Sequence, residues 1–149
     1  MQKAIDLSIE SVKNGGGPFG AVIVKDGSII AACSNSVTLS NDPTAHAEVN
    51  AIRQACKTIN NFDLKGSTVY TSCEPCPMCL GALYWARVDK IYFANTKEDA
   101  KSIGFDDSFI YEEIDLPIEK RSILTKQFMR EEALKAFKAW DENENKIEY

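Results

Sequence analysis

The chain contains a single histidine, His46, and further along it a closely spaced cysteine pair, Cys76 and Cys79. Each group stands at an expected helix start, His46 after Asp42-Pro43 and the cysteines around Pro77. Zinc prefers imidazole and thiolate ligands, and a catalytic zinc site takes three protein ligands and keeps the fourth position open. Cys76 and Cys79 are three residues apart, so their sulfurs lie on one helix face, near backbone N–H groups that favour the thiolate. Both cysteines can therefore ionise and, with His46, supply the three protein ligands of a zinc site.

Glu48 follows His46 by two positions, within the same expected helical turn. Two thiolates and a neutral imidazole leave a zinc site formally neutral, so the metal acidifies its water less than an all-histidine set does. A neighbouring base is then useful. Glu48 is close enough to reach the metal's water without being a ligand, so we expect it to act as the proton shuttle.

Other interpretations of the cysteines stay open at this point: a redox C-x-x-C pair, a structural zinc site, or cysteines of the core. None of these predicts that the only histidine is paired with a glutamate. Cys73, Cys76 and Cys79 also resemble the start of an iron–sulfur ligand run, but the fourth cysteine is missing nearby. Cys33 and Cys56 lie in apolar contexts typical of buried thiols. We assign Cys33, Cys56 and Cys73 to structure.

Residue patterns in the first half of the chain predict a helix, a hairpin and a second helix. Helical spacing of Ile5, Ile9 and Val12 predicts a helix over residues 2–13, ended by a glycine run and Pro18. Residues 21–24 and 29–32 flank an Asp-Gly turn, which predicts an antiparallel strand pair. Residues 42–45 are typical of a helix start, and an apolar stripe extends that helix to about residue 58. The stripe comprises Ala45, Val49, Ile52 and Cys56.

The second half predicts strands alternating with helices. Residues 68–71 and 90–94 are typical strands, and Pro75 and Pro77 end the first of them and permit a helix. This alternation implies parallel pairing with a right-handed crossover, to which the hairpin adds an antiparallel edge. We expect an α/β fold with a mixed sheet between helix layers. Residues 96–121 show only short periodic segments, and the last helix face precedes a polar tail over 141–149. That face comprises Met129, Ala133, Phe137 and Trp140.

Length, charge and the N-terminal residues limit the classes of function. A chain of 149 residues with 44% hydrophobic residues fits one compact domain, residues 1–149. Charged residues stand where a signal peptide has its apolar core, and no apolar run has membrane-spanning length, so we expect no membrane association. The crowded cysteines without a secretion signal favour a reducing, cytoplasmic location. The net charge of −5 disfavours a nucleic-acid partner and favours a small-molecule substrate.

The segments His46-Ala47-Glu48 and Pro75-Cys76-Pro77-Met78-Cys79 match the H-x-E and P-C-x-x-C signature of zinc nucleobase deaminases. The chain therefore resembles the cytidine deaminase superfamily, which implies a three-layer α/β/α fold. Residues 41–48, 71–79 and 104–111 together are similar to the bacterial guanine deaminases, and this resemblance extends over essentially the whole chain. The first two blocks are shared with tRNA adenosine deaminases, whereas Phe105-Asp106-Asp107-Ser108 favours guanine.

The resemblance implies a purine-catabolic hydrolase that converts guanine to xanthine and ammonia, by attack of a zinc-bound hydroxide on C2 with Glu48 moving protons. Asp107 is the candidate residue that accepts hydrogen bonds from the donor groups of guanine. Without the resemblance, a helix N-cap or a residue of a solvated turn is the better interpretation of Asp107. The resemblance also implies a homodimer with exchanged C-terminal segments, about residues 128–149. The further candidate substrate contacts are Asn35, Ala47, Phe19, Trp85, Phe105 and Tyr149.

Three other functions stay open. The motifs determine the reaction more firmly than the presence of a ribose, so guanosine or another aminated purine remains an alternative substrate. A tRNA adenosine deaminase is disfavoured because it would need basic surface. A non-catalytic, zinc-stabilised binding module would use the same ligands but has no need for Glu48.

Overall fold

The computed structural model describes residues 1–149, which form two compact units, residues 1–107 and 108–149. The elements of the first unit are α1 (Gln2–Lys13), β1 (Gly20–Lys25), β2 (Ser28–Ser34), α2 (Val37–Ser40), α3 (Ala47–Ile59), β3 (Ser67–Cys73), α4 (Pro77–Trp85), β4 (Lys90–Asn95) and α5 (Lys97–Ser102). Those of the second are α6 (Ser108–Asp115), the 3-10 helix η1 (Ile118–Lys120) and α7 (Arg130–Asp141).

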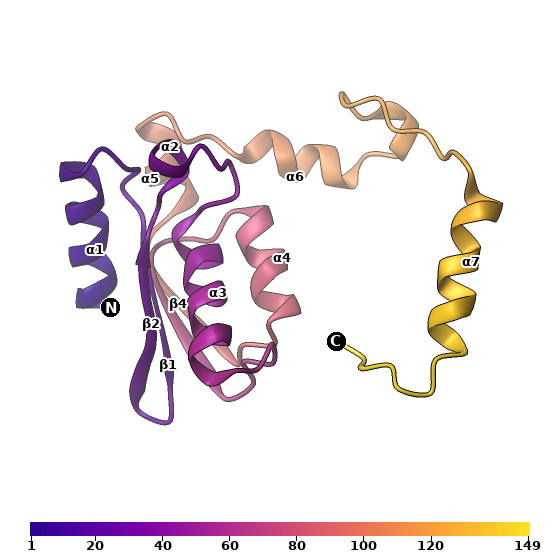
Figure 1. The fold of residues 1–149 in the computed structure, drawn as a ribbon. Coiled ribbons are helices and arrows are strands. Elements are labelled where there is room, and N and C mark those ends of the chain that lie inside the picture. Colours follow the sequence, from indigo (N-terminus) through magenta and orange to yellow (C-terminus); the bar gives the residue numbers. More distant parts are fainter. The chain divides into compact units, whose positions relative to one another are not determined.

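The first unit is built on a four-stranded sheet in the order β2-β1-β3-β4. Strand β1 is antiparallel to both of its neighbours, and β3 and β4 are parallel. Helix α1 covers one face of this sheet, and α3 and α4 cover the other (Figure 1). The predicted three-layer α/β/α fold with a mixed sheet and an antiparallel first hairpin is confirmed.

The hairpin between β1 and β2 turns at Asp26 and Gly27, whose φ angles of 50° and 75° are the positive values that a tight two-residue hairpin turn requires. Its register shifts between Ile23 and Val24, so the pairing contains an irregularity that the sequence pattern did not predict.

Helix α3 packs against the sheet through small side chains. Ala47, Ala51 and Ala55 are fully buried on one face, together with Ile23 and Val69 of the sheet. The predicted stripe of larger residues was wrong in part, because Val49, Ile52 and Cys56 are only half-buried. Alanines at the contact let the helix axis approach the strands closely, which larger side chains would prevent.

Two further expectations, one from periodicity and one from a helix-start signal, need correction. Helix α1 has the predicted bounds, but Ile9 and Val12 are 51% and 54% exposed, and the buried residues of the helix are Ala4 and Ser11. Helix α3 begins at Ala47, not within residues 42–45, because Asp42 Oδ1 accepts hydrogen bonds from the backbone N–H of Thr44 and from its hydroxyl, at 2.8 and 2.7 Å. These bonds hold a turn ahead of the helix.

The second unit contains α6, η1 and α7, and none of these helices has a buried residue. After α7, the ring of Tyr149 packs edge to face on that of Trp140, with centroids 6.4 Å apart. No helix of the protein has the length and apolar character needed to cross a membrane.

Candidate active site

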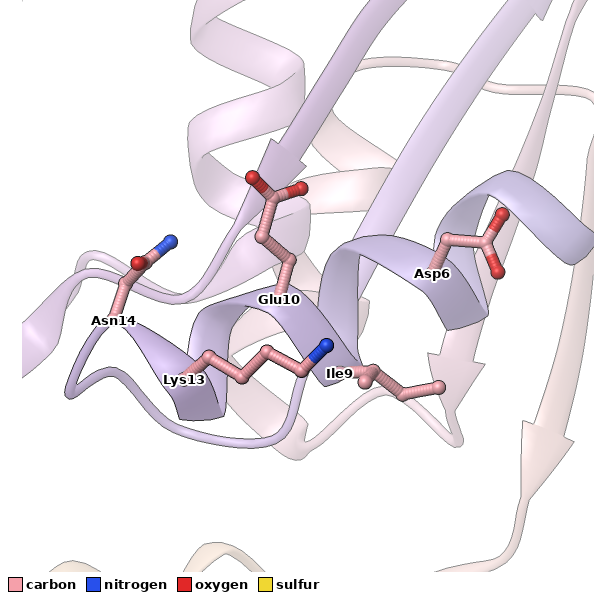
Figure 2. Close-up of a pocket in the computed structure, with 5 residues that line it drawn as sticks. All are labelled: Asp6, Ile9, Glu10, Lys13 and Asn14. Atoms are coloured by element: carbon pink, nitrogen blue, oxygen red, sulfur yellow. The ribbon is translucent and has the colours of Figure 1, made fainter.

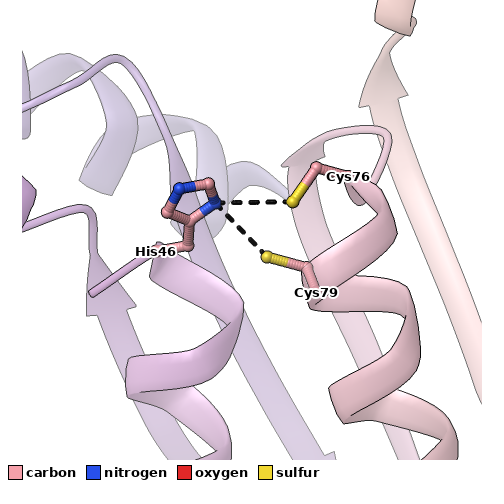
Figure 3. Close-up of side chains that lie close together, drawn as sticks. All are labelled: His46, Cys76 and Cys79. Carbon is pink, nitrogen blue, oxygen red and sulfur yellow. Dashed lines mark hydrogen bonds between the residues drawn. The ribbon is translucent and has the colours of Figure 1, made fainter. Parts of the chain in front are cut away.

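The starts of α3 and α4 bring three potential metal ligands together. His46 is the N-cap of α3 and Cys76 the N-cap of α4, both with extended backbone, and Cys79 lies in the first turn of α4. His46 Nδ1 is 3.6 Å from Cys76 Sγ and 3.4 Å from Cys79 Sγ, and all three ligand atoms lie within 4.8 Å of one another. Figure 3 shows both sulfurs pointing toward this ring nitrogen.

These distances fit a tetrahedral zinc ion. Zinc–sulfur and zinc–nitrogen bonds of about 2.3 and 2.0 Å at a tetrahedral angle place sulfur and nitrogen about 3.5 Å apart. The two nitrogen–sulfur distances of 3.6 and 3.4 Å lie on either side of that value. Two thiolates and one imidazole leave one of four positions open, as in catalytic sites.

The cluster favours ionised sulfur. Hydrogen bonding between the side chains of Cys79 and Cys76 is the largest cause that lowers the pKa of Cys76, and together with the contribution of His46 it brings this pKa to about 4. The same hydrogen bond, together with burial, raises the pKa of Cys79. The hydrogen bond with Cys76 raises the pKa of His46. A cation that displaces the remaining protons would satisfy both sulfurs and the ring nitrogen together.

Glu48, the second residue of α3, is only 5% exposed and lies beside the cluster. Its Oε1 accepts a hydrogen bond from Thr71 Oγ1 at 3.0 Å, and its Oε2 accepts one from Cys79 Sγ at 3.5 Å. Burial is the main cause that raises the pKa of Glu48, because a desolvated carboxylate is costly. A carboxyl group with a raised pKa beside a metal site can both take up and release a proton near neutral pH.

A cavity of about 800 Å³ opens next to these residues, within the first unit. His46 and Cys76 form part of its wall, and so do the predicted residues Asn35 and Asp107. The predicted aromatic residues Phe19 and Phe105 also line it, and their rings pack edge to face with centroids 4.9 Å apart. The remaining lining residues are Val12, Gly15, Gly16, Gly17, Pro18, Val37, Thr38, Ala100, Gly104 and Asp106.

Residues 1–95 match the family described as the cytidine and deoxycytidylate deaminase zinc-binding region. The chain belongs to this family. It is 57% identical to the guanine deaminase of Bacillus subtilis over 150 residues, covering 100% of this chain and 96% of that protein. A tRNA-specific adenosine deaminase of Buchnera aphidicola (subsp. Schizaphis graminum) is 35% identical over 136 residues, covering 91% of this chain and 87% of that protein.

Two solved structures that are similar to this chain are both structures of guanine deaminases. The X-ray structure of guanine deaminase from Bacillus subtilis matches with a TM-score of 0.96, covering 99% of this chain and 95% of that one at 57% identity. A structure of guanine deaminase from Nitrosomonas europaea matches with a TM-score of 0.67, covering 71% and 62% at 32% identity. The expected membership in the deaminase family and the expected zinc cofactor are thereby confirmed.

Asn35 is a buried, hydrogen-bonded residue of the cavity wall in this deaminase. It is 6% exposed, its backbone N–H donates to the Phe19 carbonyl at 3.0 Å, and its own carbonyl accepts from Ser11 Oγ at 3.2 Å. Its side-chain Oδ1 accepts from the backbone N–H of Val37 at 3.2 Å. With Oδ1 engaged in this way, the amide group is fixed in orientation.

Asp107 lies at the end of the first unit and is partly buried. Burial is the first cause that raises its pKa, and the negative charge of Cys76 is the second. Its carboxyl group is therefore electrostatically coupled to the ligand cluster.

Three predicted substrate contacts are not among the residues of this cavity. Ala47 is fully buried in the core beneath α3. Trp85, at the end of α4, is 68% exposed and borders a separate hollow with Gly81, Tyr84 and Arg87. Tyr149 belongs to the second unit and packs on Trp140.

Another hollow lies on the outer face of α1 (Figure 2). It is lined by Asp6, Ile9, Glu10, Lys13 and Asn14 and shares no residue with the metal cluster. Mixed charges on an exposed helix face are ordinary solvated surface, so this hollow adds nothing to the site.

The sequence analysis missed Thr71 and Ser11, which hold predicted site residues. One feature of the sequence indicated a role for Thr71. Its hydroxyl stands at an inward position of a strand, whereas Val69 on the same face is apolar. No feature of the sequence indicated a role for Ser11, because a serine inside an amphipathic helix is more often solvated.

Proposed function

We propose that this protein is a guanine deaminase, which hydrolyses guanine to xanthine and ammonia. The observation that carries the proposal is the likeness to guanine deaminase along the full chain, at 57% identity and a TM-score of 0.96. The chemistry comes from the buried Glu48, which lies beside the three zinc ligands. Two of these ligands, His46 and Cys76, line a cavity large enough for a purine.

Glu48 is the proposed acid and base of the reaction. Zinc, held by His46, Cys76 and Cys79, supplies Lewis-acid activation of water. Glu48 takes one proton from the attacking water and delivers it to the ring of the base. It then takes the second proton from the hydroxyl group now on C2 and passes it to the amino group, which departs as ammonia while the C2 carbonyl forms. Its burial supports this role, because a raised pKa lets one carboxyl group perform both transfers.

Asp107 and Asn35 are the residues proposed to recognise the base by hydrogen bonding. Guanine presents donors at N1 and at its amino group, whereas adenine presents an acceptor at N1. An ionised Asp107 only accepts hydrogen bonds, so it pairs with guanine's donors and repels the adenine lone pair. Asn35 supplies a fixed amide at the cavity wall.

Phe19 and Phe105 are the proposed aromatic wall. The two rings pack edge to face and give the cavity apolar aromatic surface against which a planar base can pack. Ala47, Trp85 and Tyr149 stay predicted substrate contacts.

The protein is proposed to act as a single deaminase domain, residues 1–149, in a homodimer whose segment of about residues 128–149 exchanges between subunits. The supporting feature is exposed apolar surface at the C-terminal end of the chain. Phe128, Phe137 and Trp140 are 85%, 74% and 43% exposed, and large exposed aromatic side chains favour burial against a second chain.

An ultraviolet assay of the zinc-loaded protein with guanine, guanosine, adenine, adenosine and cytidine tests the function. We expect conversion of guanine to xanthine, with release of ammonia, to exceed turnover of every other substrate. Faster turnover of guanosine would reassign the substrate to the nucleoside, and turnover of none of the five would leave a zinc-stabilised binding module. A tRNA substrate is disfavoured by the net charge of −5.

A further inference from the structure

Thr71 is a buried hydroxyl residue on the strand beneath the site. It is 1% exposed and lies on β3, which has a partner on each side, so its backbone pairs with Ala21 of β1 and with Phe93 of β4. On its face of the strand, the preceding inward residue is Val69, which is fully buried in the core. A valine would fill the same volume at position 71 without burying a polar group, so packing alone does not call for a hydroxyl.

The hydroxyl of Thr71 donates to Glu48 Oε1 at 3.0 Å. The other carboxylate oxygen, Oε2, is the one that lies next to the ligand Cys79, at 3.5 Å from its sulfur. The last torsion of a glutamate side chain is broad, so a carboxylate without a fixed donor samples many orientations. A donor on one oxygen removes this freedom and directs the other oxygen toward the metal ligands.

Thr71 is suited to be that fixed donor. Its side chain is β-branched and therefore stiff, and strand pairing on both sides holds its backbone. Cys79 cannot take the same role in the working enzyme, because a cysteine that ligates zinc is a thiolate and has no proton to donate. The Thr71 hydroxyl is then the side-chain donor that Glu48 keeps.

We propose that Thr71 is a positioning residue for deamination, which holds Oε1 of Glu48 so that Oε2 faces the metal ligands and the substrate. The inference rests on the proposed function for its kinetic consequence, whereas the orientation of the carboxylate can be observed without any substrate. Its expected signature is a loss in kcat, because a misplaced acid/base slows the chemical step and leaves guanine binding intact.

The test compares zinc-loaded Thr71→Val and Thr71→Ser with the wild type. Thr71→Val keeps shape and volume but lacks the donor, so we expect kcat for guanine to fall about 10- to 100-fold while KM changes less than about threefold. Thr71→Ser restores the hydroxyl, and its kcat should return to within about threefold of the wild type. Both variants should bind as much zinc as the wild type.

Ser67→Ala is the matched control. Ser67 lies on the same face of β3, is fully buried, and its hydroxyl has no hydrogen-bond partner. Removal of this hydroxyl should leave kcat unchanged. If Ser67→Ala slows turnover as much as Thr71→Val, the effect is a general response of the strand and the proposal is overturned.

A double-mutant cycle tests whether Thr71 acts through Glu48. Because Glu48→Gln already removes the proton carrier, adding Thr71→Val should lower kcat by less than about twofold. If Thr71→Val lowers kcat in the Glu48→Gln background by the same factor as in the wild type, the proposal is overturned. It is also overturned if Thr71→Val and Thr71→Ser lower kcat equally.

Crystal structures of the zinc-loaded wild type and Thr71→Val separate this inference from the proposed function. We expect the Glu48 carboxylate to rotate or to occupy several orientations in the valine variant only. If the wild type does not deaminate guanine, this difference still supports the positioning role, and an unchanged, ordered carboxylate in Thr71→Val overturns it.

Discussion

Replacement of Gly16 by alanine tests how tightly the wall that carries Asn35 is packed. A Cβ at this position would lie 2.5 Å from Ser11 Oγ and 2.8 Å from the Asn35 carbonyl oxygen. Both residues are buried, and these two oxygens already form a hydrogen bond at 3.2 Å. The loop cannot move away freely, because the backbone N–H of Gly16 donates to the Ser11 carbonyl at 2.8 Å.

The expected loss for Gly16→Ala combines two effects. Overpacking of a buried site costs about 1–3 kcal/mol, and loss of the Ser11–Asn35 hydrogen bond costs about 1 kcal/mol more. The free energy of unfolding should therefore fall by about 2–4 kcal/mol, which at roughly 3 °C per kcal/mol for a chain of this length lowers the Tm by about 6–12 °C. Because Asn35 shifts with its backbone, the KM for guanine should also rise.

Gly81→Ala is the control for this prediction, measured by thermal unfolding under the same conditions. Gly81 lies exposed in α4, and apart from its chain neighbours and the backbone of its own helix no heavy atom lies within 4 Å of an added Cβ. Alanine there should stabilise the helix by about 0.5–1 kcal/mol. A Gly16→Ala protein that unfolds within about 2 °C of the wild type would refute the packing inferred for this wall.

Three other outcomes are expected. Burial raises the pKa of Glu48, so the metal-free protein loses stability as pH rises above the ordinary carboxyl pKa of about 4. Metal-free Glu48→Gln should therefore have the higher Tm at neutral pH, with a gap that closes toward pH about 4, and a gap independent of pH would contradict this sign. Asp107→Asn should reduce guanine turnover far more than it reduces Tm, since it turns a donor toward guanine's donors; unchanged activity per folded molecule would make Asp107 a structural residue. Mixed dimers of Glu48→Ala with a chain lacking residues 141–149 should regain activity if the tails exchange, whereas inactive mixed dimers, confirmed by mass, would exclude exchange.

Much of the sheet was predictable because its signals are local. The Asp-Gly turn, the β-branched strand at 68–71 and the proline that opens α4 each act through their own backbone preferences. Which side of a helix is buried was less predictable, because it depends on the elements against which the helix packs. The alanine face of α3 carries little hydrophobic signal, although close packing on the sheet selects it.

The residues of the site likewise divide into those that the sequence predicted and those that it did not. His46, Glu48, Cys76 and Cys79 were predictable because metal chemistry demands these residue types at these spacings. Phe105 and Asp107 come from a segment with weak periodicity, and only the family resemblance pointed to them. Thr71 and Ser11 act through partners 23 and 24 residues away, which no local pattern reveals.

Guanine turnover by zinc-loaded Glu48→Gln, with zinc measured in the same preparation, tests the central claim most directly. The carboxamide keeps the size of the side chain but cannot carry the proton, so turnover should fall about 10²- to 10⁴-fold at unchanged zinc content. Cys76→Ser, in contrast, should lose the metal. A fully metallated Glu48→Gln protein that retains more than about a tenth of wild-type turnover would contradict the assignment of Glu48 as the acid and base of the reaction.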